Sequence, residues 1–259
     1  MKHIFFTGTL LILMLMTENT MAQFNQNKVI AHRGAWKVKN LPQNSIASLK
    51  AAIELGCEGS EFDVWMTADG VLVANHDADF EGLPIETTNF AELRKKKLPN
   101  GEAIPTAEQY LLAGKKQNKT KLIFEIKPSK VSKERTLEIT EKSVDLVSKL
   151  KMQDWVDYIS FDLDACKKIV AMDKNANVAY LNGDLTPQQA KDAGFFGLDY
   201  HYKVFQQHPE WIDQAKDLGL TINSWTVNDK ETMRWMLDKD VDFITTDEPA
   251  ILLEMVNKE

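Results

Sequence analysis

Short apolar runs alternate with stretches of helical periodicity from residue 29 to residue 245. We interpret each run as a strand, because turn residues close it and β-branched or aromatic residues are frequent in it. The main strands predicted in this way are Val29–Ala31, Phe62–Trp65, Leu122–Ile126, Val156–Phe161, Val178–Leu181, Phe196–Tyr200, Leu220–Val227 and Val241–Thr245.

The stretches between the strands carry recognisable helix signals. The helix predicted over Ser45–Leu55 stops at Gly56, a residue that favours the left-handed position after a helix. Thr186-Pro187 places an N-cap residue before a proline in the first turn. Further helices are predicted where Leu137, Val144, Val147 and Leu150 form one apolar stripe, around Cys166, and over Pro209–Leu218 and Asp229–Leu237. Strands that alternate with helices favour a parallel sheet.

The segment after the second strand departs from this alternation. Ala68-Asp69-Gly70 is typical of a tight turn between Phe62–Trp65 and Val71–Ala74, which predicts a β-hairpin. The next stretch, Asp77–Thr106, is rich in loop residues apart from a short helix near Phe90–Lys95. We therefore expect a hairpin and a short insertion at this point.

The fold class follows from the number of strand–helix units. Eight such units within residues 23–259 match the α/β class of (β/α)8, or TIM, barrels, which typically need about 250 residues. A doubly wound open sheet is the alternative, but no Gly-x-Gly-x-x-Gly motif follows any predicted strand. With no segment resembling a linker, residues 23–259 are predicted to form one barrel domain.

The first 22 residues have the order of a secretory signal peptide. A short basic start at Lys2-His3 precedes the mostly apolar run Ile4–Met16, and a small-residue site follows at Thr20-Met21-Ala22. A membrane span needs about 20 apolar residues, so this run is too short to cross comfortably. We expect cleavage near Ala22 and an exported protein, periplasmic or secreted; an uncleaved N-terminal anchor is the alternative.

Composition excludes several classes of protein. Hydrophobic residues make up 44% of the chain and charged residues 27%, which suits a globular core and is too polar for a membrane protein. A net charge of −7 argues against nucleic acid as a partner. The two cysteines, Cys57 and Cys166, rule out a disulfide scaffold and are predicted to be buried free thiols.

Three carboxylates are predicted to converge at the end of the barrel where such folds hold their active sites. Glu61 and Asp63 are two residues apart on the second strand, so their side chains share a face. Glu125 lies on the third strand at the same spacing from Lys127. Converging carboxylates raise one another's pKa values, and a bound Mg²⁺ or Ca²⁺ would relieve the repulsion. A solvated strand face and a structural ion pair are the alternatives.

Imidazoles and cations fall beside these carboxylates. His32 and Arg33 follow the first strand, and His76 follows the hairpin. Arg33 and Lys127 suit an anionic ligand, since a guanidinium can bind a phosphate through two N–H groups. With a divalent metal and two histidines as acid and base, the set predicts a phosphodiester substrate.

The chain resembles the glycerophosphodiester phosphodiesterases. The resemblance rests on motifs that occur in order along nearly the whole barrel domain: Ala31-His32-Arg33-Gly34, Pro42-Gln43-Asn44-Ser45, Gly59-Ser60-Glu61-Phe62-Asp63-Val64, Asp69-Gly70-Val71-Leu72-Val73, His76-Asp77, Ile104-Pro105-Thr106, Glu125-Ile126-Lys127, Trp225-Thr226-Val227-Asn228 and Thr246-Asp247-Glu248-Pro249. It implies a (β/α)8 barrel that uses one divalent cation, Ca²⁺ or Mg²⁺. It also implies a small-molecule glycerophosphodiester substrate, hydrolysed to glycerol 3-phosphate and an alcohol.

The resemblance also implies roles for individual residues: metal ligands Glu61, Asp63 and Glu125, an acid/base pair His32 and His76, phosphate ligands Arg33 and Lys127, and a pocket-lining Trp225. In that family the neighbouring glycerol hydroxyl is thought to attack the phosphorus, and water then opens the cyclic phosphate.

Two departures from the family pattern bear on the substrate. Gln43 stands where the family usually has glutamate, which removes a negative charge. Residues 80–89 lack the arginine of the usual Arg-Thr-Thr-x-Gly stretch, in a loop that helps to define the pocket in such barrels. The alternatives are therefore a phosphatidylinositol-, sphingolipid- or glycan-type phosphodiester as substrate, and a non-catalytic barrel that binds phosphorylated ligands.

Overall fold

Eight parallel strands close into a barrel in the computed structural model, which describes residues 23–258. These strands are β1 (Val29–Ala31), β2 (Gly59–Met66), β6 (Lys121–Ile126), β7 (Val156–Ser160), β8 (Asn177–Tyr180), β9 (Gly197–His201), β10 (Thr221–Trp225) and β11 (Phe243–Thr246). Pairing of β1 with both β11 and β2 closes the sheet. The predicted TIM barrel is thus confirmed and the open sheet is excluded. The predicted signal peptide, residues 1–22, lies outside the described residues.

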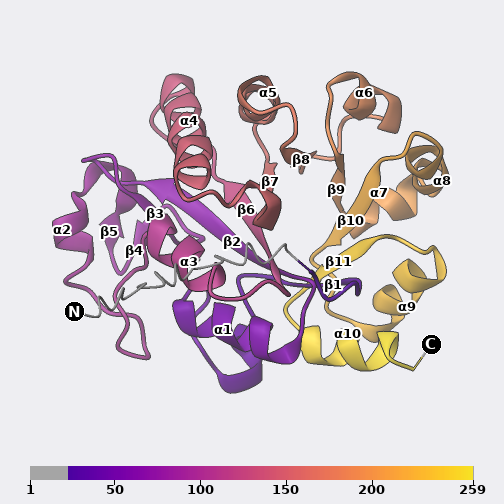
Figure 1. The fold of residues 1–259 in the computed structure, drawn as a ribbon, viewed down its shortest axis with the longest axis horizontal. Coiled ribbons are helices and arrows are strands. Elements are labelled where there is room, and N and C mark those ends of the chain that lie inside the picture. Colours follow the sequence, from indigo (N-terminus) through magenta and orange to yellow (C-terminus); the bar gives the residue numbers. More distant parts are fainter. Residues whose placement is uncertain (1–22, 259) are drawn as a thin grey trace, which may run out of the picture.

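Helices surround the strands on the outside of the barrel (Figure 1). The outer helices are α1 (Ile46–Leu55), α3 (Ala107–Gly114), α4 (Lys133–Lys149), α5 (Leu163–Met172), α6 (Pro187–Asp192), α7 (Tyr202–Gln207), α8 (Glu210–Asp217), α9 (Lys230–Asp238) and α10 (Pro249–Val256). Short 3-10 turns lie at Trp36–Lys39, Ile85–Thr87 and Gln153–Trp155. No helix within residues 23–258 is long and apolar enough to cross a membrane.

Side-chain alternation along the strands separates the apolar core from the barrel interior. Phe62 on β2 stacks on Tyr110 of α3, with ring centroids 4.2 Å apart, and lies 4.7 Å from the ring of Phe124 on β6. These rings fill the layer between strands and helices. Because neighbours on a strand point to opposite faces, Glu61 and Asp63 on either side of Phe62 point into the barrel. The fold therefore turns the acidic residues inward.

The hairpin and the insertion form a small extension beside the barrel, at the left of Figure 1. Strand β3 (Leu72–Ala74) pairs antiparallel with β2, as predicted. The insertion contains a short two-stranded sheet, β4 (Asp79–Phe80) with β5 (Leu83–Pro84), and the helix α2 (Phe90–Leu93). Buried side chains of the hairpin and the insertion together form an apolar cluster that is separate from the main core: Trp65, Val73, Phe80, Ile85, Leu93 and Ile104.

Several elements were not predicted from the sequence. Strand β2 is longer than the predicted Phe62–Trp65, and α3, α7, α10 and the small β4–β5 sheet are additional. Helix α3 has a local signal, since Thr106 and Gln109 form a capping box at its start. Cys57 and Cys166 are buried free thiols, as predicted, and burial raises the pKa of Cys57 to about 12.

We expect Gly197→Ala to destabilise the barrel. A Cβ atom at this position would lie 2.3 Å from the backbone oxygen of Thr221, so strands β9 and β10 would have to separate locally. Overpacking of this kind typically costs about 1–3 kcal/mol. Chemical denaturation measures the free energy of unfolding. Gly82→Ala is the control, because the space beside Gly82 is open and only its positive φ of 81° is unfavourable. Equal stability of Gly197→Ala and wild type would contradict the expectation.

Candidate active site

A pocket with charged and apolar walls opens at the carboxyl ends of the barrel strands. Concave sites of this kind, apolar with a few convergent polar groups, are typical of small-molecule binding. Its lining residues are His32, Arg33, Glu61, His76, Glu125, Lys127, Ile159, Phe161, Leu181, Asp199, Trp225, Thr226 and Thr245. Seven of the eight residues singled out from the sequence lie in this lining, and the eighth, Asp63, contacts two of them.

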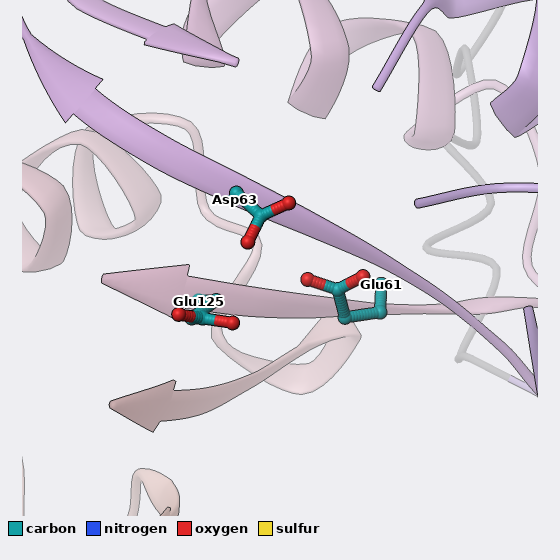
Figure 2. A group of neighbouring side chains, drawn as sticks. All are labelled: Glu61, Asp63 and Glu125. Atoms are coloured by element: carbon teal, nitrogen blue, oxygen red, sulfur yellow. The ribbon is translucent and has the colours of Figure 1, made fainter. Parts of the chain in front are cut away.

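The three predicted metal ligands come together in the barrel interior. One carboxylate oxygen from each of Glu61, Asp63 and Glu125 lies within 4.8 Å of the others, and all three side chains are buried. Figure 2 shows the first two on one strand and Glu125 on the neighbouring strand, in the register that pairs it with Asp63. Among the described residues, Oε1 of Glu61 is a buried atom without a hydrogen-bond partner, and Oε1 of Glu125 is buried beside the ammonium of Lys127. Buried carboxylate oxygens of this kind fit a divalent cation.

The electrostatics of this triad show how costly it is without a cation. Burial, with the nearby charges of Asp63 and Glu125, raises the pKa of Glu61 well above its ordinary value. Burial and the charge of Asp63 raise the pKa of Glu125 to about 8. Glu125 thus favours the protonated state at neutral pH, and the pKa of Glu61 is shifted in the same direction. A cation between them would reverse this preference.

Asp63 is the carboxylate that the protein itself neutralises. Lys127 Nζ lies 3.1 Å from its Oδ1, and Arg33 Nε lies 3.6 Å from its Oδ2. Asn44 donates from Nδ2 to Oδ2 at 2.8 Å and accepts at Oδ1 from the backbone N–H of Asp63 at 3.0 Å. Burial opposes ionisation of Asp63, but the charges of Lys127, His76 and Arg33 outweigh it and lower the pKa. Asp63 is therefore held ionised and in a fixed orientation.

The turn after β1 adopts a left-handed backbone that directs one N–H group at the triad. Arg33 has a positive φ of 56°, and its N–H donates to Glu61 Oε2 at 2.7 Å. Gly34 follows with a φ of 77°, and a Cβ there would lie 2.5 Å from Ser48 Oγ. Only glycine fits a left-handed position with so close a neighbour. This explains the His-Arg-Gly order in the sequence.

Gln43 holds the guanidinium of Arg33. Arg33 Nη1 donates to Gln43 Oε1 at 2.7 Å. A glutamate in this place would pair its charge with the guanidinium, whereas the neutral amide positions the group and leaves its positive charge for a ligand. On the other side, Lys127 lies 2.8 Å from Glu125 Oε1, and the charges of Asp63 and Glu125 raise its pKa against the effect of burial.

Each histidine of the pocket is fixed by a carboxylate at Nδ1. His32 Nδ1 lies 2.8 Å from Asp247 Oδ1, and His76 Nδ1 lies 2.7 Å from Asp77 Oδ1. An imidazole whose Nδ1–H is held in this way exchanges protons through Nε2. Burial lowers the pKa of His76, with further contributions from Arg33 and Lys127, which favours a neutral imidazole. A neutral imidazole can act as a base.

Asp247 is a functional residue whose role the sequence analysis did not predict. It accepts hydrogen bonds from Trp36 Nε1 at 3.1 Å and from Asn228 Nδ2 at 2.8 Å, besides its contact with His32. Burial opposes ionisation, but these partners hold the pKa of Asp247 far below its usual range. Its place in the Thr-Asp-Glu-Pro motif just after β11 was the available signal.

The opposite wall of the pocket is apolar. It consists of Ile159, Phe161, Leu181 and Trp225, from the region of β7, β8 and β10. The rings of Phe161 and Trp225 meet edge to face, with centroids 5.5 Å apart. Trp225 thus lines the pocket, as the sequence resemblance implied. The pocket is divided into a charged half and an apolar half.

The loop that departs from the family pattern packs away from this pocket. None of residues 80–89 is among the described lining residues. Glu86 instead accepts from Ser129 Oγ at 2.5 Å and from the backbone N–H of Lys130 at 2.8 Å. Arg135 Nε, 3.3 Å away, completes this buried network. The loop is therefore tied to the segment between β6 and α4.

Comparisons with known proteins point to one family. Residues 32–251 match the model of the glycerophosphoryl diester phosphodiesterase family. A glycerophosphodiester phosphodiesterase from Caldanaerobacter subterraneus is 33% identical over 89% of this chain and 98% of the relative. One from Bacillus altitudinis is 26% identical over 86% of this chain and 95% of the relative. The crystal structure of a glycerophosphodiester phosphodiesterase from Parabacteroides distasonis is 47% identical, has a TM-score of 0.87, and matches 91% of this chain and 99% of its own.

We expect Glu61→Gln to abolish stabilisation by divalent cations without unfolding the protein. The amide oxygen can still accept from the Arg33 N–H, but one charged ligand is lost. Thermal unfolding with EDTA, with Ca²⁺ and with Mg²⁺ measures the effect. Wild type should melt at a higher temperature with at least one of the cations, and the variant should show little or no shift. An equal shift in both proteins would remove Glu61 from the ligand set.

The same variant should reveal the raised pKa of Glu61 in EDTA. Near pH 4 the carboxyl is largely protonated in both the folded and the unfolded state, so its titration contributes little slope. As pH rises above the ordinary value of 4.5, only the unfolded state releases the proton. The free energy of unfolding of wild type should then fall relative to Glu61→Gln, by about 1.4 kcal/mol per pH unit. Parallel pH profiles in urea denaturation would contradict this.

Proposed function

The chain belongs to the glycerophosphoryl diester phosphodiesterase family, a family of phosphoric diester hydrolases, and we propose that it is a metal-dependent enzyme that hydrolyses glycerophosphodiesters to glycerol 3-phosphate and an alcohol. The observation that carries this proposal is that one pocket brings together His32 and His76, each hydrogen-bonded at Nδ1 to an aspartate, and a buried acidic triad. Acid, base, cations and metal ligands thus surround one small volume, as a phosphodiester requires.

The metal would be held by Glu61, Asp63 and Glu125. The partnerless Oε1 of Glu61 and the convergence of the three buried carboxylates support this assignment, and an all-carboxylate ligand set favours Ca²⁺ or Mg²⁺ over softer metals. When bound, the cation supplies positive charge that polarises the phosphoryl group.

The cationic side chains would bind the phosphate. Arg33, fixed by Gln43, and Lys127, fixed between Asp63 and Glu125, border the same volume as the triad. Arg33 can bind two phosphoryl oxygens through its planar guanidinium, and Lys127 contributes a compact charge. Together they would neutralise charge that develops on the phosphoryl oxygens during the reaction.

The two histidines would move the protons. One Nε2 would accept the proton of the attacking glycerol hydroxyl, and the other would protonate the oxygen of the leaving alcohol. Asp247 and Asp77 orient the rings through Nδ1 and stabilise the imidazolium that forms. In a second step the roles reverse, and water opens the cyclic phosphate.

The alcohol that leaves the phosphate is the part of the substrate that remains to be identified. Analysis of the products from a panel of diesters separates the alternatives. Release of free glycerol 3-phosphate supports a glycerophosphodiesterase, and other phosphoryl products would support a phosphatidylinositol-, sphingolipid- or glycan-type enzyme. Tight binding of metal and ligand without turnover of any diester would support a binding barrel.

Export is a further part of the proposal, and it rests on the order of basic, apolar and small residues in the first 22 positions. The native protein is expected to begin after Ala22 and to occur in the periplasm or the medium. N-terminal sequencing of protein purified from its natural source tests this, and an intact Met1 would refute it.

Replacement of either histidine should remove most of the activity. His32→Ala and His76→Ala each take away one proton-transfer group, which typically contributes about 10²- to 10⁴-fold. Turnover is measured as release of glycerol 3-phosphate from glycerophosphocholine, and folding by circular dichroism. His208→Ala is the control, because that exposed ring stacks on Trp211 on α8. Near-normal turnover of both pocket variants would refute the assigned roles.

Removal of divalent cations should abolish turnover reversibly. EDTA-treated enzyme is expected to release little glycerol 3-phosphate, and addition of Ca²⁺ or Mg²⁺ should restore the rate. Full activity in excess EDTA, after prolonged dialysis, would refute the metal requirement while leaving the acid/base roles testable through the histidine variants.

A further inference from the structure

Asp199 is a buried carboxyl in the pocket that the mechanism above does not use. It lies on β9, its side chain is 2% exposed, and its Oδ1 is one of the buried atoms without a hydrogen-bond partner among the described residues. Asn223, its register neighbour on β10, hydrogen-bonds the carboxyl. Burial outweighs that contact and raises the pKa of Asp199 to about 7. A buried acceptor without a partner is costly, so a partner from outside the chain would stabilise it.

The surroundings of Asp199 define the kind of group that fits there. Trp225 Nε1 donates to the backbone oxygen of Asp199 at 2.9 Å, which fixes the indole beside it. Phe161 packs edge to face on that indole, and Leu181 completes the apolar wall. The carboxyl thus lies beside carbon surfaces, with Asn223 as its hydrogen-bonding neighbour and Oδ1 without a partner among the described residues. This environment suits a hydroxyl group on a short carbon skeleton.

We propose that Asp199 accepts a hydrogen bond from the terminal hydroxyl of the substrate's glycerol moiety and so selects glycerol as the alcohol that stays on the phosphate. The inference rests on the proposed function. Asp199 is a specificity-determining residue in this scheme, because the terminal hydroxyl takes no part in bond making or breaking.

Two considerations assign the glycerol moiety, and not the leaving alcohol, to this place. A wall that is buried and closely packed can recognise only a group that is the same in every substrate, and glycerol is the constant part of a glycerophosphodiester. The hydroxyl next to the phosphate must reach a histidine in the charged half of the pocket. The terminal hydroxyl, one carbon further from the phosphate, then extends toward the apolar half, where Asp199 is the acceptor.

A pair of matched substrates tests the proposal without any variant. Glycerophosphocholine is compared with the 2-hydroxypropyl analogue, which keeps the attacking hydroxyl and the choline and lacks only the terminal hydroxyl. Wild type should prefer the glycerol substrate in kcat/KM by ~10- to 100-fold, because without that hydroxyl the buried acceptor stays unpaired. Hydrolysis of the two with equal kcat/KM would overturn the role of Asp199 and leave the proposed function intact.

Variants then assign the preference to one side chain. Asp199→Leu removes the acceptor at similar volume. It should lower kcat/KM for the glycerol substrate, so that the ratio of kcat/KM for the two substrates falls close to one. Asp199→Asn retains a carbonyl acceptor and should keep most of the preference. Thr226→Val is the matched control, because Thr226 lines the same pocket but lies outside the register pair of Asn223 and Asp199, so the preference should not change.

The outcomes separate this inference from the proposed function. A preference that persists in Asp199→Leu, or one that Thr226→Val abolishes equally, overturns the assignment to Asp199. If Asp199→Leu does not fold, Asp199→Ala removes the same acceptor at smaller volume and should likewise bring the preference close to one, and a preference retained in Asp199→Ala overturns the assignment. If wild type releases glycerol 3-phosphate from no glycerophosphodiester, the proposed function fails, and the assignment fails with it.

Discussion

Three carboxyl groups buried within 4.8 Å of one another are the constraint on which the rest of the site depends. Such a group of like charges, removed from water, opposes folding unless each member is protonated, hydrogen-bonded or paired with a cation. The protein satisfies one member, Asp63, with Lys127, Arg33 and Asn44. Burial and the charges of their neighbours raise the pKa values of Glu61 and Glu125, so these two carboxyls gain most from a further positive charge nearby.

The neighbouring loops are shaped by the same requirement. Arg33 adopts a left-handed backbone so that its N–H reaches Glu61, and Asn44 does so while it braces Asp63 from both sides. Left-handed conformations are unfavourable for residues with a side chain, so the surrounding contacts must hold them in place. The close approach of Gly34 to Ser48 is part of that support. Two of the left-handed residues of the chain thus place hydrogen-bonding groups against the acidic triad.

The division of the pocket follows from which strands supply its walls. Strands β1, β2 and β6 contribute the carboxylates, the cations and His32, whereas β7, β8 and β10 contribute rings and aliphatic side chains. A phosphodiester has a corresponding division between a charged phosphoryl group and carbon-bearing alcohols. Asp199 on β9 is the one carboxyl that stands outside the charged half, which is why its role is best sought in recognition of the alcohol.

Local sequence patterns determined much of this protein: the alternation of strands and helices, the hairpin after the second strand, the shared face of Glu61 and Asp63, and the placement of His32 and Arg33 after a strand. Each depends on periodicity or turn chemistry within a few residues. Tertiary structure alone decided that Asp63 lies beside Glu125, that Asp247 reaches across the closure of the barrel to His32, and that Oδ1 of Asp199 lies at the pocket without a hydrogen-bond partner among the described residues. Those relations depend on strand register and barrel closure, which join segments far apart in the chain, so no local pattern specifies them.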